Sequence, residues 1–197
     1  MEPKNTINQI YNLQEFSLDE IAKLKKVSEI NNQVFSTIDD LVICSAENSC
    51  VKEIAELWAN LASIQQISHP EKYSFQKEDK NWQAFVRKKL EKKNNLLLVA
   101  HDKGKVEVKG FLYLQTITLP SSDLILKGVI EDLYIKPQHR RQDIATKLLD
   151  VAMDWAEKQN IKQVELISLT SAKDLSLFYL QVIKNFNRDV NLDLVTF

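Results

Sequence analysis

The spacing of apolar residues changes from that of a strand to that of a helix within residues 129–149, which read VIEDLYIKPQHRRQDIATKLL. Val129, Leu133 and Ile135 recur at even spacing, which is typical of one face of a β-strand. The same alternation places Glu131 on that face and Asp132 on the opposite face.

A basic turn joins this strand to the following helix. Pro137 cannot take part in a central ladder, so we expect the strand to end near Ile135. Free N–H groups and the helix dipole favour an anion where a helix begins, so a turn carrying Arg140 and Arg141 suits a phosphate. The alternative is an ordinary strand–helix unit with both arginines merely solvated. The expected apolar stripe of the helix consists of Ile144, Leu148, Val151 and Trp155.

The rest of the chain also divides into helical and strand patterns. A capping box at residues 17–20 opens a helical stripe over residues 18–34, which is either a packed extra helix or a dimerisation arm. Asn48 or Ser49 is expected to cap the next helix. Strands are expected near residues 41–44, 96–101, 106–108, 110–119, 124–135, 164–169 and 190–197, and further helices near residues 51–62, 82–90, 144–159 and 171–183.

The order of these elements indicates the fold class. Early strands are joined by hairpins, with Gly104 available for a positive φ in the turn at residues 102–105, whereas later strands alternate with helices. This predicts an α/β fold with a mixed, mostly antiparallel sheet, helices on both faces and an extra N-terminal helix. We divide the chain into an N-terminal extension, residues 1–40, and one domain, residues 41–197.

Composition excludes several classes of function. The chain has 197 residues, 44% apolar and 27% charged, as expected for a globular protein with one sizeable core. A formal net charge of −1 argues against a dedicated binder of nucleic acid or of a membrane surface. Cys44 and Cys50 have no metal-ligand spacing with any histidine, and no signal-peptide pattern is visible. We therefore expect reduced thiols, no metal site and a cytoplasmic protein.

The order of elements from about residue 41 to residue 186 resembles the GNAT superfamily of acyl-CoA-dependent N-acetyltransferases. The most specific part is EDLYIKPQHRRQDIATKLL, residues 131–149, which is similar to the polyamine and aminoglycoside branches, where a Glu-Asp-Leu-Tyr-Val strand precedes the turn. Phe178 and Tyr179 match an aromatic pair that the family often carries on the helix after the next strand.

This resemblance implies that acetyl-CoA binds along the strand and the turn as a co-substrate. Backbone groups of Leu133, Tyr134 and Ile135 would face the pantetheine and the thioester, and would help to stabilise the oxyanion. The residues expected to hold the diphosphate are Arg140, Arg141, Gln142, Asp143, Ile144, Ala145 and Thr146.

Two positions depart from the family pattern. Asp143 stands where the family has its central turn glycine; aspartate tolerates a positive φ, but its carboxylate would lie near the diphosphate. After Tyr179, the residues Ile183-Lys-Asn-Phe186 replace a Tyr-x-x-x-Gly-Phe pattern, and little chain follows. This leaves open that the partner chain of a homodimer completes the acceptor site.

Acetyl transfer to an amine needs a base and an acid. Glu131 is the candidate base, and its alternative role is a strand carboxylate that faces solvent or pairs with a lysine. Tyr179 is the candidate acid for the leaving thiolate, and its alternative role is core packing. The candidates for the wall of the acceptor pocket are His69, Tyr73, Phe75 and Trp82, whereas the basic run at residues 87–93 is expected to be surface.

Taken with the resemblance, these residues predict an N-acetyltransferase that moves an acetyl group from acetyl-CoA directly to a primary amine, carried by a small molecule, in a ternary complex. The main alternative is a catalytically degenerate module of the same fold that has lost acetyl-CoA binding and serves in binding or dimerisation. A further alternative is an enzyme that acetylates protein lysines or N-termini.

Overall fold

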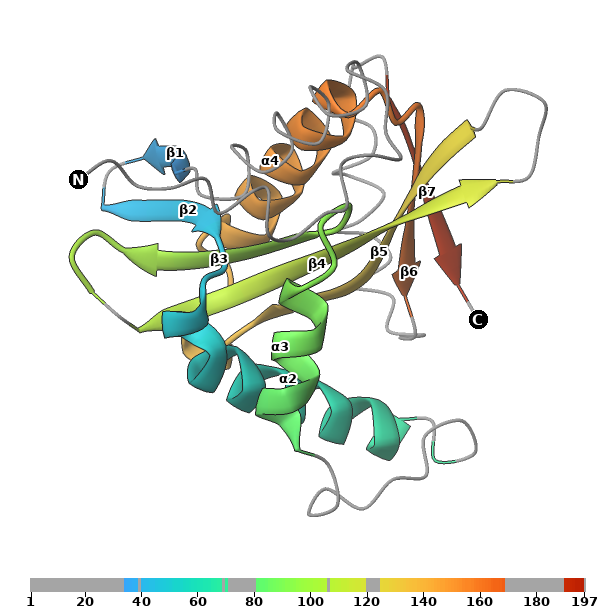
Figure 1. Cartoon of the computed structure of the whole chain (residues 1–197). Coiled ribbons are helices and arrows are strands. Elements are labelled where there is room, and N and C mark those ends of the chain that lie inside the picture. The colour runs from blue at the N-terminus through green and yellow to red at the C-terminus, as the bar shows by residue number, and fades with distance from the viewer. Residues whose placement is uncertain are drawn as a thin grey trace, which may run out of the picture.

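One sheet of seven strands forms the centre of the protein. The computed structural model describes residues 34–38, 40–68, 70, 81–105, 107–119, 125–168 and 190–196. The spatial order of the described strands follows the chain, from β1 at one edge to β7 at the other (Figure 1). The strands are β1 (Val34–Ile38), β2 (Leu41–Ser45), β3 (Leu96–Asp102), β4 (Val108–Leu119), β5 (Ile125–Ile135), β6 (Gln163–Ser168) and β7 (Asn191–Thr196).

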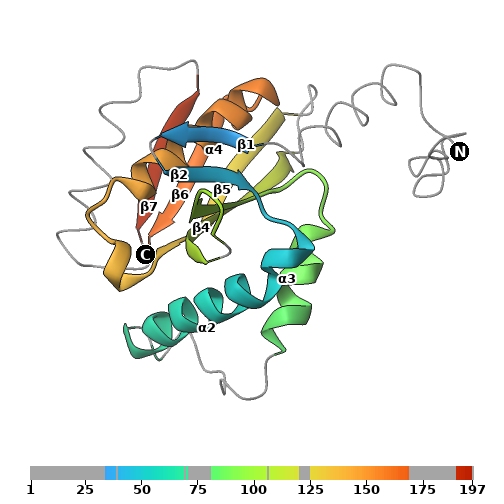
Figure 2. The same ribbon diagram turned by 90° about the vertical axis from the view of Figure 1, so that its left-hand side faces the viewer.

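The sheet is mixed and mostly antiparallel. The pairs that join β1 through β5 are antiparallel, and β6 runs parallel to both β5 and β7. Helix α4 (Ile144–Lys158) covers one face, and α2 (Val51–Ser68) and α3 (Trp82–Leu90) cover the other (Figures 1 and 2). The predicted fold class, an α/β sheet flanked by helices on both faces, is therefore confirmed.

Each face of the sheet carries its own apolar cluster. The predicted helical stripe of α4, from Ile144 to Trp155, is buried against one face together with residues such as Leu112 and Ile130. On the other face Trp58 of α2 packs against Phe111, with their ring centroids 4.7 Å apart. Because a strand turns alternate side chains to opposite faces, β4 supplies both clusters.

The turns at the strand ends follow the sequence prediction. β5 ends at Ile135, and a 3-10 helix (Pro137–His139) follows directly. Gly104 has a φ of +72°, and the N–H of Lys105 donates to the carbonyl of Asp102 at 3.0 Å, as a tight turn requires.

Several of the predicted elements need correction or stay open. Val34 does not close a helical stripe but begins β1, which pairs with β2. Asn48 and Ser49 lie within a 3-10 helix (Asn48–Cys50) that leads into α2, rather than at a cap position. The predicted helices at residues 17–33 and 171–183 lie outside the described residues, and the domain boundary after residue 40 stays a prediction.

The described helices include none that is both long enough and apolar enough to span a membrane.

We expect Gly110→Ala to destabilise the end of β5. Gly110 pairs with Ile135, and a Cβ at this position would lie 2.7 Å from the carbonyl oxygen of Tyr134, which is backbone and cannot rotate away. The strands must then shift, at a cost of about 1–3 kcal/mol in the free energy of unfolding. Urea denaturation measures this.

Gly104→Asn is the control, because its turn leaves open space around a Cβ and asparagine tolerates a positive φ. A loss at Gly110 no larger than the loss at Gly104 would contradict the close approach of β4 and β5.

Candidate functional site

A β-bulge in β5 organises the polar side chains on the α2–α3 face. Tyr113 of β4 pairs with Asp132, but the next residue, Leu114, pairs with Ile130, so Glu131 is an extra residue in β5. A bulge of this kind interrupts the alternation of side chains along the strand.

The bulge overturns the predicted face of Glu131, whereas Asp132 lies where the sequence placed it, on the face opposite Leu133 and Ile135. Glu131 was expected on the face of Leu133 and Ile135, with Asp132 on the opposite face. Instead, Leu133 and Ile135 pack against the α4 cluster. Glu131 binds Lys89 of α3, and Asp132 accepts a hydrogen bond from the indole of Trp58 of α2. Both carboxylates therefore lie on the α2–α3 face.

Glu131 forms an ion pair with a lysine, one of the two alternatives to its role as a base. The Nζ of Lys89 donates to Oε2 of Glu131 at 2.8 Å, and the two side chains are 15% and 31% exposed. The prediction that the whole basic run at residues 87–93 lies on the surface is therefore wrong for Lys89. The reason is tertiary: the carboxylate that Lys89 meets is 42 residues away in sequence.

Among the carboxyl groups that the structure describes, Asp132 shows the largest change in pKa. Desolvation raises the pKa of Asp132 from 3.8 to about 6, and the nearby charge of Glu131 adds to this rise. The hydrogen bond from Trp58 and the charge of Lys89 act in the opposite direction. A carboxyl group with a pKa near neutrality is suited to accept and return a proton.

Tyr113 and Asn95 complete this group of polar residues. The Nδ2 of Asn95 donates to the hydroxyl of Tyr113 at 2.6 Å. Burial raises the pKa of Tyr113 to about 12, so its hydroxyl stays protonated at neutral pH. We call Lys89, Asn95, Tyr113, Glu131 and Asp132 the bulge cluster.

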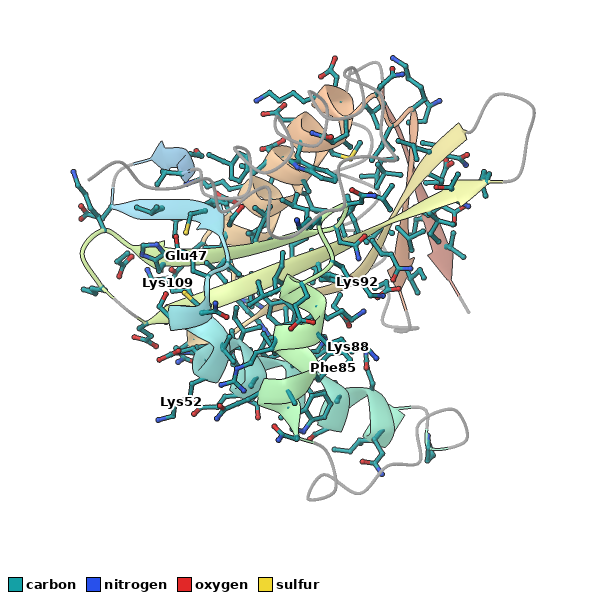
Figure 3. All side chains as sticks on the ribbon, in the orientation of Figure 1. Glu47, Lys52, Phe85, Lys88, Lys92 and Lys109 are labelled. Atoms are coloured by element: carbon teal, nitrogen blue, oxygen red, sulfur yellow. The ribbon has the colours of Figure 1, made fainter. Side chains whose placement is uncertain are left out.

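A cleft of about 450 Å³ reaches the bulge cluster from outside, and Lys89 and Asn95 line it. Its other walls are residues 45–49, between β2 and α2, and the segment around the end of α3. Figure 3 labels two lining residues, Glu47 and Lys92, and also Phe85 on α3. We call it the Lys89 cleft.

The second part of the site is a gap between β5 and β6. The two strands pair only from Lys127 to Ile130 of β5 and from Gln163 to Leu166 of β6, although β5 continues to Ile135 and β6 to Ser168. In Figure 1 they separate toward their C-terminal ends. Among the described strands, residues 132–135 pair with β4 alone, so their backbone groups on the β6 side have no partner in a described strand.

The start of α4 lies directly beyond this gap. The first intrahelical bond runs from Lys147 to the carbonyl of Asp143 at 3.0 Å, so the N–H groups of Ile144, Ala145 and Thr146 precede it. These N–H groups and the positive end of the helix dipole form a site for an anion. Gln142 is exposed beside them, with its amide 3.4 Å from the carbonyl of Gln138.

The turn adopts the backbone that the sequence predicted for Asp143. Arg141 and Asp143 have φ values of 59° and 55°, so Asp143 takes the left-handed conformation in place of a glycine. Its side chain is exposed and makes no capping bond to α4. Arg140 is not merely solvated: its Nε donates to the carbonyl of Ile135 at 3.1 Å, and its guanidinium lies 5.9 Å from the ring centroid of Tyr134.

The predicted site residues thus fall into two groups joined by β5. Glu131 belongs to the bulge cluster, and the residues from Leu133 to Thr146 line the gap and the turn. Trp82 packs edge-on against Phe85, 5.8 Å away, rather than along the Lys89 cleft. The candidates His69, Tyr73, Phe75 and Tyr179 lie outside the described residues.

Sequence reasoning missed Lys89, Asn95 and Tyr113 and underrated Asp132. One signal was available: Phe85 and Lys89 are four residues apart, so they lie on one face of α3. The bulge itself could not be predicted from the sequence, because residues 131–134, Glu-Asp-Leu-Tyr, have the pattern of a regular strand.

Among the described residues, the cysteines and histidines show no arrangement of a nucleophilic or metal site. Burial raises the pKa of Cys44 to about 11, which disfavours the reactive thiolate, although its Sγ lies 3.6 Å from Nε2 of His101. His101 and His139 are half-buried. Over the described part of the chain, no three His, Cys, Asp or Glu side chains gather as metal ligands would.

Comparison with known proteins adds independent information. The acetyltransferase (GNAT) family model matches residues 58–179, which is more than half of the chain. Among curated proteins, none matches the sequence significantly.

Solved structures with a similar fold share little sequence identity with the chain. An aminoglycoside acetyltransferase from an uncultured soil metagenomic sample has a TM-score of 0.58 and 18% identity, over 82% of this chain and 97% of that one. Ribosomal-protein-alanine N-acetyltransferase from Brucella melitensis has a TM-score of 0.55 and 19% identity, over 74% and 94%. Glucosamine-6-phosphate N-acetyltransferase from Arabidopsis thaliana has a TM-score of 0.54 and 14% identity, over 75% and 92%.

We expect Asp132→Asn to stabilise the protein at neutral pH. Asp132 has a higher pKa when folded, about 6, than its ordinary value of 3.8, so the folded chain binds its proton more tightly. Its contribution to stability is present below about pH 4 and is lost as the pH rises to about 6. Asparagine cannot ionise, so this loss of stability does not occur, and its side-chain oxygen can still accept the hydrogen bond from Trp58. The gain in the free energy of unfolding should be about 1–3 kcal/mol at pH 7.5.

Urea denaturation at several pH values from 4 to 7.5 checks this, and the gain should vanish near pH 4. Asp40→Asn, at an exposed position, is the control. A gain that is equal at both positions, or that is independent of pH, would refute the desolvation of Asp132.

Proposed function

The chain belongs to the acetyltransferase (GNAT) family, and on that premise we propose that it transfers an acetyl group from acetyl-CoA to a primary amine of a small molecule. The observation that carries this proposal is the gap between β5 and β6, which opens next to the free N–H groups of α4. A gap between strands suits an extended chain, and a helix N-terminus suits a diphosphate. Pantetheine and diphosphate are joined in this order in acetyl-CoA.

The residues of the turn fit a diphosphate except at Asp143. The N–H groups of Ile144, Ala145 and Thr146 would donate to it, with the exposed Arg141 adding positive charge. The carboxylate of Asp143 makes no capping bond to the helix, and its negative charge lies beside the N–H groups that would bind the diphosphate. When bound, acetyl-CoA would supply the activated acetyl group, and backbone groups of residues 133–135 would line the thioester.

The acceptor amine would approach the bulge cluster. We assign its two carboxylates different tasks. Glu131, which already binds an ammonium group, would bind the amine in its charged form, and Asp132, with a pKa of about 6, would accept the proton directly or through a water. Tyr179 remains the proposed acid for the departing thiolate. The raised pKa of Cys44 favours direct transfer over a covalent acetyl-enzyme.

We also propose that the chain is most similar in function to the polyamine and aminoglycoside branches of the family. A carboxylate pair at the acceptor position suits a cationic small molecule such as a polyamine or an aminoglycoside. A cytoplasmic location and a homodimer stay predictions from the sequence.

The competing function is a catalytically degenerate module, and the specific observation in its favour is Asp143 beside the anion site. Calorimetric titration with acetyl-CoA separates the two. Micromolar binding, roughly −8 kcal/mol, supports the transferase. Absence of acetyl-CoA binding by the folded protein supports the catalytically degenerate module. An acceptor panel that includes peptides then tests small molecules against protein N-termini and lysines.

We expect Asp143→Gly to tighten acetyl-CoA binding about tenfold, which corresponds to about 1.4 kcal/mol. The change removes a negative charge from the anion site and suits the φ of 55°. Calorimetry with acetyl-CoA and desulfo-CoA measures the affinity.

Asp143→Asn distinguishes the effect of the negative charge from the effect of backbone conformation, because asparagine removes the charge and tolerates a positive φ. It should reproduce most of the gain. Unchanged affinity in both variants would rule out the electrostatic account of Asp143.

We expect Glu131→Gln and Asp132→Asn to change different kinetic parameters. Asp132→Asn should lower kcat about 10²–10⁴-fold and remove the fall in rate that the native enzyme shows below about pH 6, where Asp132 is protonated. Glu131→Gln should mainly raise KM for the amine. Steady-state kinetics from pH 5 to 9 checks both expectations. If Glu131→Gln lowers kcat and Asp132→Asn mainly raises KM, Glu131 is the base instead.

A further inference from the structure

Lys89 differs from three other cations around the end of α3. Lys88, Lys92 and Arg87 are exposed, whereas the side chain of Lys89 is only 15% exposed and crosses to the sheet. Its Nζ lies 2.8 Å from the carboxylate of Glu131. The charge of Lys89 also influences the protonation of the neighbouring Asp132.

The surroundings of this ammonium group include two aromatic rings. The Nζ of Lys89 lies 4.1 Å from the ring centroid of Tyr113 and 5.4 Å from that of Phe85. A carboxylate combined with aromatic faces is the arrangement that binds alkylammonium ions. The bulge cluster is therefore a built ammonium site, and a side chain of the protein itself occupies it.

We propose that Lys89 takes the place of the acceptor's ammonium group, so that a primary alkylammonium substrate must displace it. This inference rests on the proposed acetyl transfer, because the same two carboxylates would bind and deprotonate the acceptor. It specifies the acceptor as a primary amine on an unbranched alkyl arm, the shape of the lysine side chain itself. Lys89 is then a residue that determines specificity.

The Lys89 cleft provides the place to which the displaced side chain moves. Lys89 lines this cleft of about 450 Å³, so its flexible stem can rotate into it while α3 stays in place. Glu47 lines the same cleft and offers a second carboxylate. The native protein therefore binds the amine more weakly than a variant without Lys89, because displacing Lys89 reduces the apparent affinity.

The test uses Lys89→Ala with n-propylammonium chloride as the probe. The substitution removes the lysine side chain beyond Cβ, which has the size and charge of n-propylammonium. The probe should raise the Tm of Lys89→Ala in a concentration-dependent manner and bind at least about tenfold more tightly than to the native protein. n-Propanol, which has the same shape without the charge, should not stabilise the variant, and potassium chloride keeps the ionic strength constant.

Two further variants isolate the site. Lys92→Ala removes an exposed lysine from the same cleft and should behave as the native protein does. Lys89→Ala combined with Glu131→Gln lacks the carboxylate and should lose the probe. If Lys89→Ala does not fold, Lys89→Met keeps the stem, and ammonium chloride is its matched probe.

The outcomes separate this inference from the proposed function, since the binding measurement needs no acetyl-CoA. Failure of the probe to bind the Lys89 variant, equal affinity for the native protein, or binding that survives the loss of Glu131 overturns the inference. Transfer from acetyl-CoA to n-propylamine is measured separately by release of free thiol. Binding by the Lys89 variant without transfer would uphold the ammonium site and count against the acetyltransferase.

Discussion

The structure of the site depends on one extra residue in a strand. Because β4 supplies no partner for Glu131, β5 bulges, and two consecutive carboxylates face the same helices. Pairing between β5 and β6 ends at Ile130, immediately before the bulge. A bulge bends its strand and increases the local twist, so the same feature accounts for the acidic pair and for the gap beside it.

The bulge also concentrates charge at a place where desolvation is costly. Glu131 forms an ion pair with Lys89, whereas desolvation raises the pKa of Asp132, and the hydrogen bond from the indole of Trp58 offsets this rise only in part. A pair of adjacent acids with such different surroundings is a recurrent arrangement in acid–base catalysis, because one group stays ionised while the other exchanges a proton. The aromatic rings of Tyr113 and Phe85 lie 4.1 Å and 5.4 Å from the Nζ of Lys89 and contribute cation–π attraction to its position.

The anion site at α4 and the bulge cluster lie at different points along β5, and β5 connects them as a rigid element. The end of β5 is fixed by its close approach to Gly110 and by Arg140, which binds the carbonyl of Ile135. A ligand held at the turn and extended along the gap would therefore reach the bulge in a defined register. The rigid sheet therefore fixes the position of the bulge cluster relative to the anion site.

The sequence by itself determined the elements and the turn. The periodicity of residues 144–155 predicted α4 and Pro137 predicted the end of β5, because these are local constraints. The positive φ of Asp143 was expected because this residue stands where the resembled family has a turn glycine, and aspartate tolerates that conformation. Only the tertiary structure decided that Glu131 shares the face of Asp132, that Lys89 leaves the surface, and that β5 and β6 separate. The register between two strands and the partner of a charge depend on contacts between residues distant in the chain, which no local pattern records.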